Sequence, residues 1–273
     1  MPHLLILGLG YTATRIAAAA EARGWTVTGT SRDGRAGTLP FDAAASAIGR
    51  ATHILSSIPP AGDEDPVLVA YRHALVRSGA WLGYLSSTGV YGDSGGAWVD
   101  ESAPVGRGRR SARAAADAEW LALGARVFRL PGIYGPGRSA LDRVAAGRAH
   151  RIDLPDQVFS RVHVDDIVSG VIAGFEAPPG AYNLADDHPC SQNAVIEAAC
   201  DLLGLRWPAL QTLDEAGLSP MARGFYAENR RVANGKAKRV LGWAPRFADY
   251  AAGLRALSAT TSPASVSTQP SPD

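Results

Sequence analysis

The feature that most constrains the fold is a strand, glycine turn, helix and second strand within the first 32 residues. An apolar run at 4–7 leads to Gly8 and Gly10, an Ala-rich segment with helical character follows, and a second β-type run covers 25–30. Gly8 permits the positive φ of a tight turn, Gly10 lets the backbone approach a pyrophosphate, and Ala13 is small enough for close helix–strand packing. Glycines also serve ordinary turns, but a strand before them and a helix after them favour a dinucleotide-binding site.

The end of the second strand favours NADP as the dinucleotide. A site for NAD usually carries Asp or Glu about 20 residues beyond the glycines, whereas an Arg there accommodates the 2′-phosphate of NADP. Here the second strand ends in Thr30-Ser31-Arg32, and the first acid after it is Asp33. Arg32 can pair with a phosphate through its planar guanidinium while Ser31 donates a hydroxyl. The alternative is an Arg on a solvated loop. The pattern predicts NADP rather than NAD.

The charge balance gives no reason to expect a nucleic acid or an anionic membrane as partner. The 273 residues include 27 basic and 26 acidic side chains, a net charge of +1. No apolar run approaches the roughly 18 residues of a membrane span, and Cys190 and Cys200 form no CxxC or metal-ligand pattern. Because the glycine turn comes so early, we expect no leader peptide before it. These observations predict a cytoplasmic protein with a small-molecule substrate and no metal.

Strand and helix patterns continue to alternate along the chain. Predicted strands cover 38–42, 53–57, 81–87 and 127–130, and predicted helices cover 66–78 and 109–123. Such alternation indicates an α/β fold with a parallel sheet covered on both faces and ligands bound over the carboxyl ends of the strands.

A chain of this size can form one enlarged domain or a main domain with an appendage. We expect a dinucleotide-binding core at 1–189, with a returning strand near 181–186. A small, mostly helical lobe on the substrate side follows at 190–257. Residues 258–273 are rich in Ser, Thr, Pro and Gln without apolar periodicity, which predicts a disordered tail.

Successive blocks of sequence resemble the extended short-chain dehydrogenase/reductase family. The blocks are SSTGVYG at 86–92, RLPGIYGPGR at 129–138 and RVHVDDI at 161–167. YNLADD at 182–187 and the segment from NRRV to LGW at 229–243 are similar to the NAD-dependent epimerase/dehydratase branch. The resemblance covers nearly everything up to residue 257. It implies a Rossmann-type, doubly wound parallel sheet with a small C-terminal lobe.

The resemblance places a substrate contact at the first block. In the family a Ser or Thr there hydrogen-bonds the substrate oxygen at the reacting carbon. Ser87, three residues before Val90, matches that position, and Thr88 is a neighbouring candidate. The alternative for Ser87 is a strand-end serine that satisfies local backbone donors.

The chain departs from the family at the catalytic base. Family members carry a Tyr followed four residues later by a Lys, which lowers the pKa of the phenol so that it can transfer a proton. Segment 106–119 contains neither residue type. Aligning Glu119 with the family's glutamate puts Ser111 in place of the Tyr and Ala115 in place of the Lys. This pattern resembles an atypical subgroup of the family in which the cofactor site persists.

Other side chains could complete the catalytic set: an Asp in place of the fourth catalytic residue, and Tyr91 or Tyr134 for the missing proton transfer. The atypical subgroup tends to have an Asp in place of the fourth catalytic residue; Asp65 fits, with Asp63 as the next choice. For Asp65 the stronger interpretation is a helix cap, because an acid directly before Pro66 is favoured at a helix start without any active site. Tyr91 and Tyr134 carry phenols near the expected site, although both match residues that are structural in the family.

The arginines of segment 107–113 allow two interpretations. Arg107, Arg109, Arg110 and Arg113 could hold an anionic substrate by paired hydrogen bonds. A solvated helix start is the favoured interpretation, because runs of charge usually face water.

The remaining expected contacts lie at the strand ends. Tyr11 and Thr12 can offer backbone N–H groups or a hydroxyl to the pyrophosphate. The resemblance implies contacts from Asp42 to the adenine, from Ser56, Ser57, Ile58 and Pro59 to the riboses, and from Pro131, Gly132 and Ile133 to the nicotinamide. It also implies that Arg230 or Arg231 could grip the diphosphate of a nucleotide sugar.

Two functions of different classes follow. The first is an NADP-dependent oxidoreductase or epimerase/dehydratase-like enzyme acting on a small carbonyl, alcohol or sugar-like substrate. The second is a non-catalytic NADP-binding redox sensor or scaffold. The missing Tyr-Lys pair favours the sensor, whereas Ser87, the PGIYGPGR block and the substrate-side lobe favour the enzyme. A family-like pair of helices could also form a homodimer.

Overall fold

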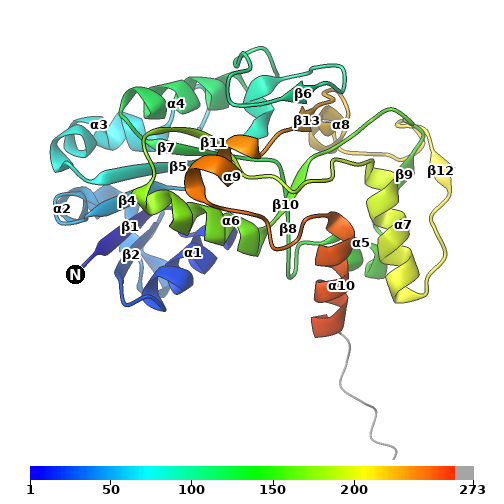
Figure 1. Cartoon of the computed structure of the whole chain (residues 1–273), viewed down its shortest axis with the longest axis horizontal. Helices are drawn as coiled ribbons and strands as arrows, with labels where there is room; N and C mark the ends of the chain where they lie inside the picture. The colour runs from blue at the N-terminus through cyan, green and yellow to red at the C-terminus, as the bar shows by residue number, and fades with distance from the viewer. Residues whose placement is uncertain (262–273) are drawn as a thin grey trace, which may run out of the picture.

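The centre of the molecule is a seven-stranded parallel sheet in the computed structural model, which describes residues 1–261 (Figure 1). Its strands in spatial order are β11 (Gly180–Asn183), β7 (Arg126–Leu130), β5 (Trp81–Ser87), β4 (His53–Ser56), β1 (His3–Leu7), β2 (Thr26–Ser31) and β3 (Leu39–Pro40). All neighbouring pairs are parallel. The predicted Rossmann-type fold is confirmed.

Helices cover both faces of the sheet (Figure 1). On one face lie α2 (Ala45–Ile48), α3 (Pro66–Ser78) and α4 (Ser111–Ala122), and on the other lie α1 (Tyr11–Glu21), α6 (Val164–Ala173) and α9 (Gly235–Leu241). Away from the sheet are α5 (Ala140–Ala145), α7 (Gln192–Leu203), α8 (Pro220–Phe225) and α10 (Tyr250–Thr261). Short 3-10 turns span Arg35–Gly37, Phe41–Ala43, Thr88–Tyr91 and Gly174–Glu176.

The first strand shows how this sheet is buried. Leu4 and Ile6 pack into the apolar cluster beneath α1 and α6, while Leu5 and Leu7 pack into the cluster beneath α3 and α4. Successive side chains of a strand point to opposite faces, so a strand covered on both faces must be apolar at every position. This is why the run at 4–7 does not alternate with polar residues.

Three short parallel strand pairs lie outside the central sheet. They are β8 (Gly132–Tyr134) with β10 (Arg161–His163), β9 (Arg151–Ile152) with β12 (Leu210–Gln211), and β6 (Trp98–Val99) with β13 (Arg231–Val232). The pairs β8–β10 and β6–β13 bring residues of the second half of the chain next to the segments that follow β7 and β5.

The apolar clusters do not follow the predicted order of core and lobe along the chain. Ala237 and Trp243, in the predicted lobe, pack in the same cluster as Leu4. Leu141 and Val144, in the predicted core, pack with α7 and α10 in a separate cluster. The division at residue 190 stays a prediction.

The predicted boundary of the disordered tail, residue 258, lies inside a helix. α10 (Tyr250–Thr261) continues through residues 258–261, so the expectation of disorder from residue 258 is wrong for these four residues. The rest of the predicted tail, 262–273, lies outside the described residues. Among the helices of residues 1–261, none is both long and apolar enough to cross a membrane.

Candidate functional site

The turn between β1 and α1 has the form that a pyrophosphate needs. Gly8 has φ +89°, and a Cβ added to it would lie 2.5 Å from Cγ1 of Ile58. Gly10 is extended at φ −100°, and a Cβ added there would meet no heavy atom within 4 Å. Gly10 is the N-cap of α1, and no side chain caps that helix. Open space over Gly10 and uncapped N–H groups at the helix start therefore fit the phosphates of a dinucleotide.

A cavity of about 970 Å³ opens next to this turn, at the carboxyl ends of β1, β4, β5 and β7. Twelve of the candidate residues line it: Gly10, Tyr11, Thr12, Ser57, Pro59, Ser87, Thr88, Pro131, Gly132, Ile133, Tyr134 and Arg230. The structure thus brings the predicted phosphate, nicotinamide and substrate contacts to one space. The remaining ten candidates lie outside the lining: Gly8, Ala13, Ser31, Arg32, Asp42, Ser56, Ile58, Asp65, Tyr91 and Arg231.

The residues outside the lining include some that shape the turn from behind. Ala13 is fully buried against the sheet, as close helix–strand packing requires. Ile58 supports the turn through its contact with the Gly8 position. Ser56 is also fully buried, and its hydroxyl has no hydrogen-bond partner, so it cannot contact a ribose in this conformation. The prediction for Ser56 is therefore wrong, because the last residue of a strand buried on both faces points into the core rather than out of the sheet end.

At the end of β2 the predicted NADP residues lie on the surface. Arg32 is exposed and has no recorded ion pair within residues 1–261. The hydroxyl of Ser31 is already engaged: it donates to Asp33 at 3.3 Å and accepts from the N–H of Arg35 and the hydroxyl of Thr38. Of the two, Arg32 is the side chain that is free to meet a phosphate. Asp42, also exposed, lies in the 3-10 turn that directly follows β3.

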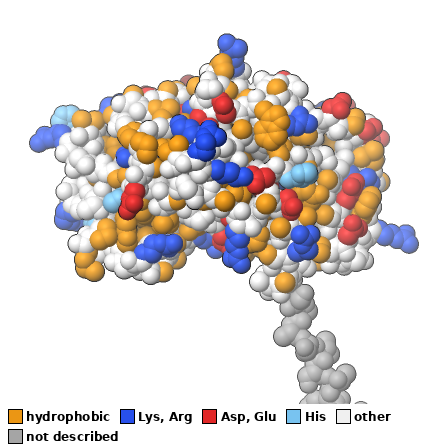
Figure 2. Space-filling model, viewed as in Figure 1, with side chains coloured by type: hydrophobic (Ala, Val, Ile, Leu, Met, Phe, Trp, Pro, Cys, Tyr) orange, Lys and Arg blue, Asp and Glu red, His pale blue; other side chains and the backbone are white. Residues whose placement is uncertain are grey.

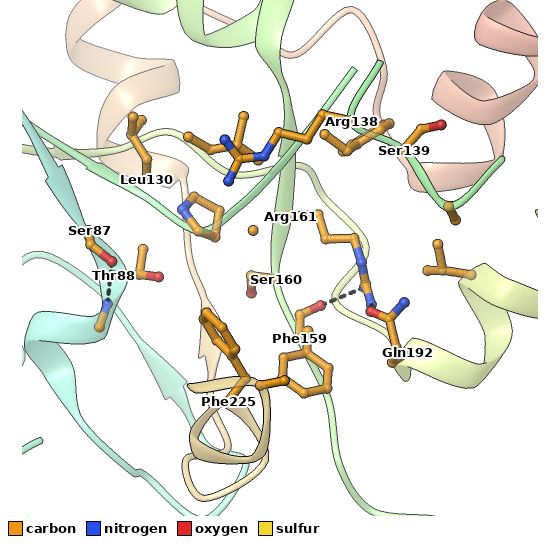
Figure 3. Close-up of a pocket in the computed structure, with 18 of the residues that line it drawn as sticks. Ser87, Thr88, Leu130, Arg138, Ser139, Phe159, Ser160, Arg161, Gln192 and Phe225 are labelled. Atoms are coloured by element: carbon orange, nitrogen blue, oxygen red, sulfur yellow. Dashed lines mark hydrogen bonds between the residues drawn. The ribbon is translucent and has the colours of Figure 1, made fainter. Parts of the chain in front are cut away.

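Ser87 and Thr88 reach the cavity from the end of β5 (Figure 3). Ser87 Oγ accepts a hydrogen bond from the backbone N–H of Gly89 at 3.1 Å. Because this bond uses a lone pair of the oxygen, the hydroxyl proton of Ser87 is free to donate into the cavity. The geometry accommodates both interpretations of Ser87, the local cap and the substrate contact.

Asp65 has a structural role. Its Oδ1 accepts from the N–H groups of Val67 and Leu68 at the start of α3, and its Oδ2 accepts from the indole N–H of Trp120 at 3.0 Å. The residue is buried and does not reach the cavity. The capping interpretation explains Asp65 fully, and we discard it as a catalytic candidate.

Tyr91 belongs to a buried polar network beneath the cavity. Its hydroxyl donates to Asn183 Oδ1 at 2.7 Å and accepts from Arg129 at 3.0 Å, and Arg129 forms a two-point ion pair with Asp117. Ser86 donates to the same carboxylate at 2.6 Å. Burial raises the pKa of Tyr91 to about 12. A phenol with this pKa and no access to the cavity cannot replace the missing base, so the catalytic prediction for Tyr91 is wrong in this geometry.

Tyr134 lines the cavity but is tightly packed. Its hydroxyl lies over the backbone of Gly253 in α10, where an added Cβ would be far too close, and its ring contacts His163 edge to face. Burial raises the pKa of this phenol, with further contributions from Asp186 and Asp166. These contacts favour a role in packing α10 against the sheet end.

Arginines dominate the charge of the cavity, although the sequence-based interpretation favoured a solvated position for those at 107–113. Eight line it: Arg109, Arg110, Arg113, Arg138, Arg143, Arg148, Arg161 and Arg230. Only Asp142 and Glu228 supply negative charge to the lining. On the face shown in Figure 2, by contrast, basic and acidic side chains are interspersed. Such a lining favours an anionic ligand.

The arginines differ in how they are held. Arg161 points away from Ser87 and donates to the carbonyls of Phe159, Cys190 and Ser191 (Figure 3). Arg138 reaches across the cavity toward Leu130 in the same view. Arg230 binds Glu228 at 2.9 Å, whereas Arg231 donates to the carbonyl of Gly96 beside β6 and lies outside the lining. Of the two predicted diphosphate contacts, only Arg230 faces the cavity.

Comparison with known proteins places this geometry in a family. A conserved protein of unknown function from Silicibacter pomeroyi has 40% sequence identity and a TM-score of 0.89, with 95% of this chain and 99% of that chain covered. The chain belongs to the same family as this protein. The human epimerase family protein SDR39U1, solved with NADPH, has a TM-score of 0.76 at 18% identity, covering 94% of this chain and 99% of its own. These likenesses confirm the fold that the resemblance to extended short-chain dehydrogenases/reductases implied.

Two curated relatives extend the comparison. Protein YeeZ of Escherichia coli K12 is 28% identical over 276 residues, covering 86% of this chain and 94% of YeeZ. The 3-diazoavenalumate denitrifying reductase of a Streptomyces species is 32% identical over 158 residues, about half of each chain. The search with family models found no match.

Proposed function

We propose that the protein is an NADP-dependent oxidoreductase, or an epimerase/dehydratase-like enzyme, that acts on a small carbonyl or sugar-like substrate. The observation that carries the proposal is that the phosphate turn at Gly10 and the substrate candidate Ser87 open into one cavity, with Pro131, Gly132 and Ile133 in its lining. Structural neighbours of the same fold include an NADPH-bound protein, and a relative over half the chain is named a reductase.

The proposal assigns NADP rather than NAD from the residues at the end of β2. Arg32 is exposed and unpaired within the described chain, so its guanidinium is available for a 2′-phosphate. Asp33, the nearest acid, is held by Arg35 at 4.0 Å and by Ser31, rather than turned toward a ribose.

In this proposal the bound nicotinamide supplies or accepts a hydride at the reacting carbon. Ser87 orients the substrate by donating its free hydroxyl proton to the substrate oxygen. The α4 positions that carry the phenol and ammonium in relatives hold the exposed residues Ser111 and Ala115. In this proposal Ser87 holds the substrate oxygen by its hydroxyl proton, and the proton that the oxygen gains on reduction, or loses on oxidation, is exchanged with solvent in the cavity.

The alternative is a non-catalytic NADP-binding redox sensor. It is favoured by the missing Tyr-Lys pair and by the burial of Tyr91, which keeps that phenol out of the cavity. The arginine-rich cavity favours the enzyme. A sensor that binds only the dinucleotide would not need additional arginines in the part of the cavity that lies past Ser87. The homodimer and the cytoplasmic location stay predictions.

Titration with NADPH and NADH tests the cofactor assignment. We expect Arg32→Ala to weaken NADPH binding by about 10-fold, the loss of one charge-assisted hydrogen bond, and to leave NADH binding unchanged. Equal losses for both dinucleotides would refute the NADP assignment. NADPH oxidation across aldehydes, ketones and nucleotide sugars, with Ser87→Ala as control, then separates the two functions: tight binding of NADPH without turnover of any of these substrates would support the sensor.

A further inference from the structure

The start of α4 is pressed against the turn that follows β5. A Cβ added to Gly92 would lie 2.8 Å from the backbone nitrogen of Gly108, and one added to Gly108 would lie 2.6 Å from Cα of Gly92. The two backbones touch, which only glycine at both positions allows. This contact fixes the loop that leads into α4 and therefore the positions of the arginines that follow it.

Arg110 consequently lies beside Ser87. A Cβ added to Gly89 would lie 2.5 Å from Cδ of Arg110, 3.1 Å from its Nε and 3.3 Å from Oγ of Ser87. The guanidinium and the serine hydroxyl thus flank the same glycine, and both residues line the cavity. The ring of Phe225, on α8, lies under two of these cations, 4.7 Å from the guanidinium carbon of Arg109 and 5.8 Å from that of Arg110.

The cations at the start of α4 are only partly neutralised. Glu228 accepts from the backbone N–H of Arg109 at 3.0 Å, lies 3.7 Å from the guanidinium of Arg109 and also binds Arg230. Within residues 1–261 neither Arg110 nor Arg113 has a recorded carboxylate partner. Arg113 donates to the hydroxyl of Tyr84 and to the carbonyl of Leu85, both neutral groups.

This arrangement costs the folded protein free energy. Burial and the like charges of Arg109 and Arg113 lower the pKa of Arg110. Positive side chains at the start of a helix also oppose its dipole, and α4 has no acidic residue in its first turn. Helix stability cannot be the reason for these arginines, whereas an anion between them would offset both costs.

We propose that Arg110 and Arg113 form a subsite for an anionic oxygen group of the substrate, a carboxylate or a phosphoryl group. This group would lie next to the reacting carbon, whose oxygen accepts a hydrogen bond from Ser87. The substrate is then an acid whose reacting carbon lies close to its charged group. Arg230 also faces the cavity and its charge acts on Arg110, but it is paired with Glu228 at 2.9 Å, whereas Arg110 and Arg113 have no such carboxylate partner within residues 1–261. The inference rests on the proposed function only in treating Ser87 as the substrate contact.

The probes are oxalate for the carboxylate, inorganic phosphate for the phosphoryl group, and oxamide as a neutral analogue of oxalate. Each is titrated by calorimetry into the protein loaded with NADP⁺ and into the unloaded protein. Arg110→Gln removes the central charge of the subsite. Arg107→Gln is the matched control, because Arg107 is exposed, lies three residues away and does not line the cavity.

We expect at least one of the two anions to bind the wild type and oxamide to bind far more weakly. Arg110→Gln should weaken binding of that anion about 10- to 100-fold, the worth of hydrogen bonds to a charged group, while Arg107→Gln stays within about twofold of the wild type. The anion that binds more tightly, oxalate or phosphate, shows whether the subsite prefers a carboxylate or a phosphoryl group. NADPH affinity should be the same in all three proteins.

Three results would overturn the subsite: wild-type binding of the anions in Arg110→Gln, equal binding of oxamide and oxalate, or a parallel loss of NADPH affinity in Arg110→Gln, which would assign the guanidinium to the cofactor. If wild-type protein binds no NADPH, the proposed function fails, and the titration of the unloaded protein still decides whether the anion subsite exists.

Discussion

Substitution of the two glycines of the phosphate turn allows an effect on folding stability to be distinguished from an effect on cofactor affinity. The same substitution, Gly→Ala, is made at Gly8 and at Gly10. At Gly8 the new methyl group adopts a backbone conformation with φ +89° and lies 2.5 Å from Cγ1 of Ile58. A non-glycine residue in the left-handed region costs about 1–2 kcal/mol, and an overlap of this kind about 1–3 kcal/mol. Gly8→Ala should therefore destabilise the protein by about 2–5 kcal/mol.

At Gly10 the same methyl group meets open space and an allowed backbone conformation. Alanine is a poorer N-cap than glycine by about 0.5–1 kcal/mol, and the reduced freedom of the unfolded chain offsets this by about 0.4–1 kcal/mol. We expect the free energy of unfolding of Gly10→Ala to stay within about 0.5 kcal/mol of the wild type. The methyl group occupies the space where a pyrophosphate would approach, so NADPH affinity should fall about 10- to 100-fold, the equivalent of an overlap costing about 1–3 kcal/mol.

The assay pairs urea unfolding of the free protein with calorimetric titration of NADPH for the wild type and both variants. The reasoning is refuted if Gly10→Ala binds NADPH as the wild type does, because the open space over Gly10 would then not be the phosphate site. It is also refuted if Gly8→Ala unfolds at the wild-type urea concentration.

Two further predictions follow from buried polar groups. Tyr91→Phe should lower stability by about 1–3 kcal/mol, because Nη1 of Arg129 and Oδ1 of Asn183 each lose the hydrogen bond to the phenol. NADPH affinity should not change; reduced affinity would mean that the network, which meets the cavity lining at Ser86, also positions the cofactor. Burial raises the pKa of Asp186 to about 7, well above the ordinary value of about 3.9. Its charged form is thus disfavoured in the folded state, so stability is greatest below pH 4 with respect to this group, falls by up to about 4 kcal/mol as the pH rises to about 7, and is constant above. Urea midpoints between pH 4 and 8 should show this slope in the wild type and lack it in Asp186→Asn; the same slope in both proteins would exclude Asp186 as its source.

Local patterns predicted the elements that frame the site well. α3 spans Pro66–Ser78 and β5 spans Trp81–Ser87, the ranges expected from the sequence. Proline at the first helical position and a left-handed glycine, Gly79, after the last one mark the limits of α3. The glycine turn was also predicted, because its requirements concern backbone conformation at single residues.

Predictions that depended on where a side chain points were less successful. Asp65 and Tyr91 were chosen for their chemical type, but their partners, Trp120, Arg129 and Asn183, lie 38 to 92 residues away in the sequence. No local pattern indicates whether such a partner will neutralise a group or leave it free. The arginines of 107–113 read as a solvated run for the same reason.

The close contact between Gly92 and Gly108 decides which of those arginines faces the cavity. It joins two segments that are separate in the sequence and that carry no shared motif. The arginines of the subsite could be named from the sequence, but their position beside Ser87 could not be predicted from it.

The bond from Trp120 to Asp65 has a consequence for how variants of this protein are interpreted. With the ion pair of Arg72 and Glu119, it fastens α3 to α4 at two points. The loop that carries Ser57 leads into α3, and the arginines of the subsite lie at the start of α4. The two segments of the cavity lining are therefore coupled through the packing of α3 against α4. A substitution at Asp65 would disturb the packing of α3 against α4 and so reduce turnover, although Asp65 has no chemical role. A loss of activity therefore indicates a chemical role only for side chains that face the cavity.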